Sequence, residues 1–244
     1  QAMDLAVKEG RGNTAFVYAM VLGTWPACQA ADLFARVAPE AASIPANDRI
    51  LAGVLLTCGG DKAKEAPALL DKLMVTAGSD MERAELLSQR GQFLQQAAGK
   101  PEEAVAVYEE ALKYNPNDVV TLNNLAYLLS DELKQHATAL PYARKAVALK
   151  PDVANVVDTL GWIYVQMGTY DQGIAVLTTA VGLDDAPAEC WYHLGEACRR
   201  AGKFEDAANI MAEARAKARA AGSDYLIELV KQSMAKVEAR DAAP

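Results

Sequence analysis

The sequence has few of the residues on which most enzyme active sites depend. Its 244 residues include only two histidines and four cysteines, and they contain no glycine-rich phosphate loop or Gly-x-Ser-x-Gly motif. Histidine and cysteine come together only at Cys190, His193 and Cys198, on one predicted helix. At 100° per residue, His193 and Cys198 point about 140° apart, which disfavours a shared metal ion. We therefore expect no catalytic residue, no cofactor and no metal site, and a thiol or zinc enzyme is the least favoured alternative.

The chain also lacks a long apolar run and an excess of positive charge. No segment approaches the run of about 18 apolar residues that can span a membrane. Lys and Arg number 24 against 32 Asp and Glu, so the formal net charge is −8. Nucleic acids and anionic membrane surfaces are bound by cationic protein surfaces. The composition therefore disfavours nucleic acid and direct membrane insertion, and it leaves a neutral or cationic protein or peptide as the partner.

The cysteines are expected to be free thiols. Cys190 and Cys198 are eight residues apart on one predicted helix, about 12 Å at 1.5 Å per residue, which is too far for a disulfide. Free thiols favour a reducing compartment such as the cytoplasm. The sequence begins without methionine, inside a predicted helix over residues 1–9. We therefore expect the chain to be part of a longer protein.

What the sequence does contain is a repeat of small residues. One small residue recurs in the first of two predicted helices at spacings of 35, 35 and 34, and two further columns recur in the second helix in the same register. The columns are Gly91, Ala126, Gly161 and Gly195; Ala104, Ala139, Gly173 and Ala207; and Ala111, Ala146, Ala180 and Ala214. Small residues let two helices approach closely, and a single hairpin cannot bury its apolar stripe alone. This period predicts hairpins that stack into a helical solenoid.

These residues resemble the tetratricopeptide repeats. That family places a large residue, Leu-Gly and an aromatic residue in the first helix, then small, aromatic and small residues in the second, with a closing Pro. The best matches are Trp191, Leu194, Gly195, Phe204, Ala207 and Ala214 in one copy, and Leu122, Leu125, Ala126 and Tyr127, preceded by Tyr108, Ala111 and Pro116, in others. Departures include Arg90 in place of Leu and Ala143 in place of an aromatic residue. The resemblance covers residues 84–220.

The resemblance implies an all-α, right-handed superhelical solenoid of about six helical hairpins with a C-terminal capping helix. We expect divergent hairpins over residues 1–78, regular repeats over 79–220, and the capping helix and tail over 221–244. Within the regular part, the expected hairpins span 80–114, 118–149, 153–182 and 187–220. The first two of these carry one extra residue between their helices.

The resemblance also implies a partner-binding groove lined by the first helices. The expected groove residues share one helical face in each repeat. They are Asn123, Tyr127, Asn155, Asp158, Trp162, Glu189, Tyr192, Glu196 and Arg199. Asn can hold a peptide backbone by paired contacts, and Tyr and Trp supply large contact areas at low entropic cost. For Tyr127 and Trp162, packing between adjacent hairpins is an open alternative.

Two functions follow from this arrangement. The favoured one is a non-catalytic scaffold that binds a peptide or a partner helix in its concave groove. The second is a structural or self-assembling spacer, because runs such as Asn-Asn-Leu-Ala-Tyr are similar to repeats in large bacterial secretion and polysaccharide-export proteins. That second role would place the domain in the periplasm, whereas the free thiols favour the cytoplasm. Both compartments stay open, and self-association is compatible with either.

Overall fold

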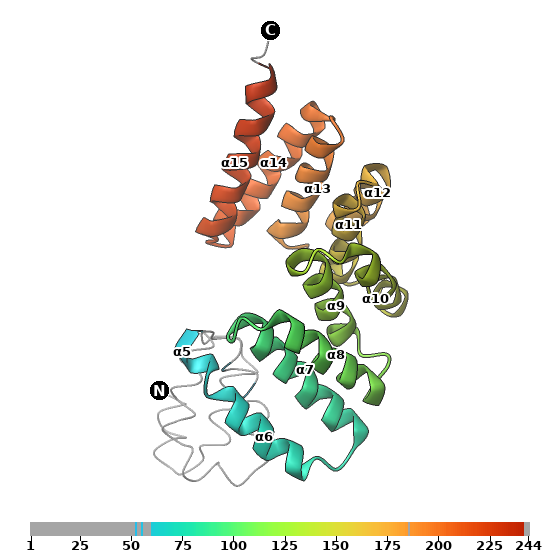
Figure 1. The fold of residues 1–244 in the computed structure, drawn as a ribbon. Helices are drawn as coiled ribbons and strands as arrows, with labels where there is room; N and C mark the ends of the chain where they lie inside the picture. Colours follow the sequence, from blue (N-terminus) through green and yellow to red (C-terminus); the bar gives the residue numbers. More distant parts are fainter. Residues whose placement is uncertain (1–51, 53–54, 56–59, 185, 242–244) are drawn as a thin grey trace. The chain divides into compact units, whose positions relative to one another are not determined.

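The computed structural model describes residues 52, 55, 60–184 and 186–241, and every regular element within them is a helix (Figure 1). The elements are α5 Gly60–Ala63, α6 Ala66–Thr76, α7 Asp80–Gln96, α8 Pro101–Tyr114, α9 Val119–Tyr127, η1 Leu128–Glu132, α10 His136–Leu149, α11 Ala154–Gln166, α12 Tyr170–Val181, α13 Ala188–Arg200, α14 Phe204–Ala220 and α15 Asp224–Asp241. The predicted all-α repeat fold is confirmed. In the described part, none of the helices combines the length and apolar character that crossing a membrane requires.

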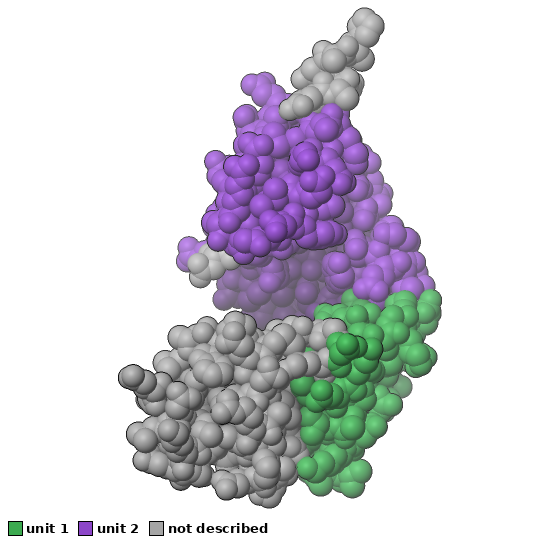
Figure 2. Space-filling view, turned by 90° about the vertical axis from the view of Figure 1, so that its left-hand side faces the viewer, with its two compact units in different colours: residues 1–116 green, residues 117–244 purple. Residues whose placement is uncertain are grey.

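The chain forms two compact units, residues 1–116 and residues 117–244, here called unit 1 and unit 2 (Figure 2). Much of the segment expected to hold divergent hairpins, 1–78, lies outside the described residues. The hairpin expected over 80–114 is the pair α7–α8 in unit 1. The other three expected hairpins are α9–α10, α11–α12 and α13–α14, all in unit 2.

In unit 1, the hairpin α7–α8 begins at a reciprocal cap. The Ser79 hydroxyl accepts a hydrogen bond from the Glu82 backbone N–H at 3.2 Å, and the Glu82 carboxylate accepts one from the Gly78 N–H at 2.8 Å. Such a pair satisfies backbone donors that the first helical turn leaves unpaired. The fully buried ring of Tyr108 on α8 then packs over Gly91 on α7, where a Cβ would stand 2.5 Å from the ring. The small residue at this column is therefore a packing requirement.

Unit 2 is a stack of three hairpins closed by α15. Each first helix packs against the next one, α9 on α11 and α11 on α13, and α13 packs on α15 in the same way. Each second helix packs on the element that begins the following hairpin, so that α10, α12 and α14 contact α11, α13 and α15. Leu226 and Val230 of α15 are buried against Ala214 and Ala218 of α14. The apolar stripe of the last hairpin is thus covered.

Within unit 2, α11 and α12 approach each other closely at Gly161 and Gly173. A Cβ added at Gly173 would lie 2.6 Å from Val165 Cγ2 and 3.1 Å from the carbonyl oxygen of Gly161. A Cβ added at Gly161 would lie 2.7 Å from Cγ of Leu177, which is fully buried. Both positions belong to the repeated columns of small residues, so the repeat pattern predicts the packing of α11 on α12.

The extra residue of the hairpin α9–α10 is accommodated by a π-helical turn. Ala126 and Ala139 are thirteen positions apart, whereas Gly161 and Gly173 in the next hairpin are twelve positions apart. Directly after α9, residues Leu128–Glu132 form the π-helix η1, a rare conformation that often occurs at functional sites. This turn carries Asp131, which makes the contact to α11 described below.

Candidate partner-binding face

The candidate site is one face of the first helices of unit 2, here called the first-helix face. It comprises the nine predicted groove residues together with Gln166, His193 and Arg200 of the same helices and Asp131 of η1, which directly follows α9. Residues three, four and seven positions apart in a helix share a side, and α9, α11 and α13 lie next to one another in the stack. The face is therefore built from three repeats.

Trp162 is the centre of this face and connects three helical elements. Its side chain is only 8% exposed. The indole Nε1 donates a hydrogen bond to Asp131 Oδ1 of η1 at 3.2 Å. The ring stacks on His193 of α13 with centroids 4.4 Å apart and planes 18° apart, and the guanidinium carbon of Arg200 lies 5.0 Å from the ring centroid. Trp162 thus packs between adjacent hairpins.

His193 pairs with Asp158 across adjacent repeats. The ring Nδ1 of His193 lies 2.8 Å from Asp158 Oδ2, and Asp158 is 7% exposed. Burial alone would lower the pKa of His193, but the charge and hydrogen bond of Asp158, with smaller effects of Asp131 and Glu189, raise it above its ordinary value. Burial and then the negative charge of Asp158 also raise the pKa of the Cys190 thiol. The pair therefore favours a protonated imidazole under the Trp162 ring and a neutral thiol.

We expect the His193–Asp158 pair to make the stability of unit 2 depend on pH. Because the pKa of His193 is raised on folding, the protonated imidazole contributes stability that is fully present below about 6.5 and is lost as pH rises through the folded pKa. Asp158→Asn keeps the size of the side chain and removes its charge, so this variant should lose that part of the pH dependence. Denaturant unfolding of both proteins, followed by circular dichroism between about pH 5 and pH 8, measures the difference. Superimposable pH profiles would contradict the assignment.

Glu196 forms a second buried cluster beside the first. Its carboxylate, 4% exposed, accepts hydrogen bonds from Arg199 at 2.6 and 2.8 Å, from Arg200 at 2.9 Å and from the Ser233 hydroxyl of α15 at 3.2 Å. Burial alone would raise the pKa of Glu196, but the hydrogen bonds and charges of the two arginines lower it below the ordinary value. Arg200 also donates to Gln166 of α11 at 2.9 Å. Glu196 thus connects α13 to α15 and, through Arg200, to α11.

The remaining predicted groove residues reach the surface. Tyr127, 41% exposed, donates a hydrogen bond to Asp131 Oδ2 at 3.3 Å, and burial together with Asp131 raises the pKa of its phenol to about 12. Asn155 and Glu189 are exposed. Asn123, Tyr192 and Arg199 are half-buried. The predicted set therefore divides into a buried layer, formed by Asp158, Trp162 and Glu196, and an exposed or half-buried layer formed by the other six.

The sequence did not indicate the contacts of His193, or that Ser233 of α15 would bond to this face. His193 was considered as a possible metal ligand, and it is 35 residues from Asp158, about one repeat. A histidine one repeat after an aspartate on the same helical face is a signal that would have indicated the pair. In the described part of the chain, no three His, Cys, Asp or Glu side chains are grouped as metal ligands, and Cys190 and Cys198 are buried free thiols.

Family models match three stretches of the chain. Tetratricopeptide-repeat models match residues 84–118 and 107–140, and the model of anaphase-promoting complex, cyclosome, subunit 3 matches residues 132–214. Among curated proteins, the human cell division cycle protein 16 homolog is 37% identical over 62 residues, which are 25% of this chain and 10% of that protein. The match therefore spans about a tenth of the length of this relative.

Solved structures of repeat proteins match over most of the chain. A MamA structure from Desulfovibrio magneticus RS-1 is 26% identical, with a TM-score of 0.59 over 74% of this chain and 97% of that chain. TTC0263, a thermophilic TPR protein from Thermus thermophilus, is 18% identical, with a TM-score of 0.63 over 78% of this chain and 99% of that chain. At 18% identity, the similarity to TTC0263 shows the fold alone.

Proposed function

The chain belongs to the tetratricopeptide-repeat family, and from this premise we propose that it is a non-catalytic scaffold that binds an extended peptide or a partner helix along the first-helix face of unit 2. The family membership and the helical-repeat fold make a protein–protein interaction scaffold the general function. The proposal adds where the partner binds and which residues contact it.

The observation that carries the proposal is the division of the first-helix face into two layers. Asp158, Trp162 and Glu196 are buried and bonded to neighbouring hairpins. The exposed side chains above them are consequently fixed on a rigid support, and a pre-organised surface loses less entropy when a partner binds. Scattered exposed polar residues would not share such a support.

The exposed layer has the chemistry that a peptide requires. Tyr127 and Tyr192 offer large aromatic contact areas with few rotatable bonds. Asn155 is exposed, and its amide can donate to and accept from a peptide backbone. The Oδ1 atom of Asn123 is buried without a hydrogen-bond partner in the described part of the chain. Buried unsatisfied groups are uncommon, and a donor from a bound segment would satisfy this one.

We expect the double variant Tyr127→Ala, Asn155→Ala to bind peptides at least about tenfold more weakly than the unmodified chain. Tyrosines at the centre of an interface commonly contribute about 2 kcal/mol or more, and about 1.4 kcal/mol already corresponds to a factor of ten. Peptides selected from a random phage-displayed library on the full chain are the probes, and fluorescence anisotropy measures their affinity.

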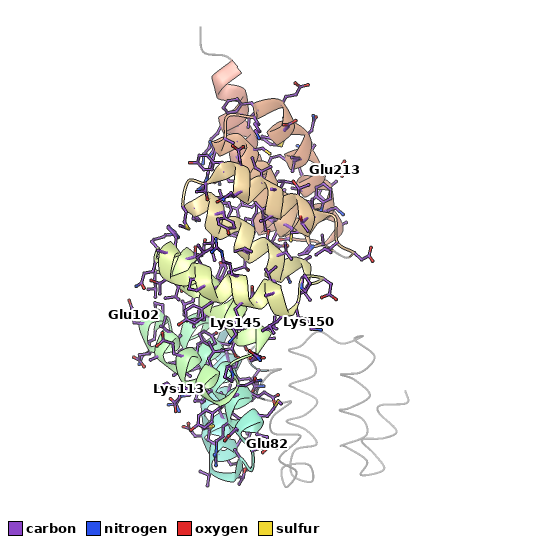
Figure 3. All side chains as sticks on the ribbon, turned by 90° about the vertical axis from the view of Figure 1, so that its right-hand side faces the viewer. Glu82, Glu102, Lys113, Lys145, Lys150 and Glu213 are labelled. Atoms are coloured by element: carbon purple, nitrogen blue, oxygen red, sulfur yellow. The ribbon has the colours of Figure 1, made fainter. Side chains whose placement is uncertain are left out.

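The matched control is Glu213→Ala, a substitution of an exposed residue on α14, away from the first helices (Figure 3). This variant should keep the affinity for the selected peptides. The melting temperature of both variants should stay close to that of the unmodified chain, because exposed substitutions rarely change stability by more than about 0.5 kcal/mol. Selected peptides that bind the double variant and the unmodified chain equally would contradict the proposed site.

A further inference from the structure

Asp131 is the most unusual charged group of the first-helix face. Its two carboxylate oxygens accept hydrogen bonds from Tyr127 at 3.3 Å and Trp162 at 3.2 Å, and both donors are neutral. Within the described ranges, no cationic side chain lies within 4.0 Å of this carboxylate. Lys134 donates to the backbone carbonyl of Asp131 instead. Asp131 is thus a half-buried negative charge that its described surroundings leave without an ion-pair partner.

The other carboxylates of this face differ in their partners. Asp158 is paired with His193 across adjacent repeats. Glu189 is exposed on α13, and its negative charge, like those of Asp158 and Asp131, raises the pKa of His193. Arg199 and Arg200 both donate hydrogen bonds to Glu196, whose single negative charge balances one of their two positive charges. Asp131 and Glu189 are therefore the carboxylates of this face that have no ion-pair partner within the described ranges, in a chain whose net charge is −8.

A tyrosine ring that is partly exposed adjoins the Asp131 carboxylate, because the Tyr127 hydroxyl donates to it. Tyr127 and Tyr225 are 41% and 77% exposed, and Tyr192 is half-buried. Tyr225, in the first turn of α15, contributes to the raised phenol pKa of both Tyr127 and Tyr192. A tyrosine face attracts an ammonium or guanidinium group within about 6 Å, and a nearby carboxylate adds to the attraction.

We propose that the partner segment carries an arginine or lysine side chain, and that the first-helix face receives its cation at the Asp131 carboxylate, beside the ring of Tyr127. This inference rests on the proposed function, because it assigns a chemical class to the segment that the first-helix face binds. The occupant is a basic segment of a protein partner, and the unpaired charge at Asp131 is the complement that selects it. Glu189 provides a second carboxylate for a further basic residue.

The test uses the full chain and the phage-selected peptides described above. The selected sequences should be enriched in Arg and Lys. Asp131→Asn keeps an oxygen that accepts the hydrogen bond of Trp162 and removes the negative charge. We therefore expect this variant to bind the selected peptides about tenfold more weakly. Peptides in which citrulline replaces arginine should lose affinity by a similar factor. Raising the salt concentration from about 0.05 M to about 0.5 M should lower the affinity of the basic peptides and leave the affinity of the citrulline peptides unchanged.

The control is Glu213→Gln, which removes one negative charge from α14, and it should leave the affinity unchanged. Equal weakening by Glu213→Gln and Asp131→Asn would overturn the inference, because binding would then follow the total charge. Neutral peptides that are weakened by the Tyr127 and Asn155 substitutions but not by Asp131→Asn would overturn the inference and leave the proposed function standing. Peptides that depend on none of these residues would overturn both.

Discussion

Trp162→Ala is expected to lower the free energy of unfolding by about 3 to 5 kcal/mol, the range found when large aromatic side chains are removed from a core. The indole is 8% exposed and stacks on His193, and its Nε1 bonds to Asp131. Its removal leaves a cavity between α11 and α13 and takes one of two hydrogen-bond donors from Asp131. Denaturant unfolding of the full chain measures the loss.

A smaller substitution separates packing from hydrogen bonding. Trp162→Phe retains a ring against His193 but has no N–H for Asp131, so we expect a loss of about 1 to 2 kcal/mol. Tyr225→Ala is the control for an aromatic residue that is 77% exposed, and its effect should stay within about 0.5 kcal/mol. If Trp162→Ala costs no more than Tyr225→Ala, Trp162 is not the centre of the face.

Gly173→Ala is expected to destabilise the chain by about 2 kcal/mol, although alanine is the better helix former. The added Cβ would lie 2.6 Å from Val165 Cγ2, 3.1 Å from the Gly161 carbonyl oxygen and 3.2 Å from the Val165 nitrogen. Two of these atoms belong to the backbone and cannot rotate away, so α11 and α12 must separate. Overpacking of this kind costs about 1 to 3 kcal/mol, more than the gain in helix propensity of about 1 kcal/mol.

Gly182→Ala is the matched control on the same hairpin. A Cβ at Gly182 would meet only the carbonyl oxygens of Thr178 and Thr179, at 3.4 and 3.5 Å. These are close to ordinary contacts, so its effect on the unfolding free energy should stay below about 1 kcal/mol. Equal midpoints of denaturant unfolding for the two alanine variants would show that the column of small residues does not control the packing of the helices.

Much of the fold could be predicted from the sequence because the repeat fixes one contact several times. Gly91 under Tyr108, Gly161 against Leu177 and Gly195 near Met211 each place a small residue of a first helix beneath a large residue of the second. The backbone conformation that accommodates each extra residue could not be predicted in the same way. One hairpin absorbs its extra residue in the π-helix Leu128–Glu132, and the other has a turn with Gly99 at φ +62°. Periodicity indicates that a residue is added but not which backbone hydrogen bonds change.

The first-helix face could be predicted only in part, because burial depends on partners from other repeats. Trp162 and Tyr127 occupy equivalent positions, yet Trp162 is buried by His193 and Arg200 while Tyr127 is 41% exposed. Glu196 is buried because Arg199, Arg200 and Ser233 all donate to it. The spacing of Arg199 and Arg200, three and four residues after Glu196, indicates those two contacts, but Ser233 lies on a helix about one repeat away, and no spacing within a single repeat reveals its contact.

The central claim is that a partner binds the exposed layer of the first-helix face in unit 2. Chemical-shift mapping on the isotopically labelled full chain, titrated with a phage-selected peptide, tests it most directly. We expect the largest shifts to fall on Tyr127, Asn155, Glu189 and Tyr192 of the first helices and on Asp131 of η1. Shifts concentrated on the second helices α10, α12 and α14, with the first-helix residues unchanged, would contradict it.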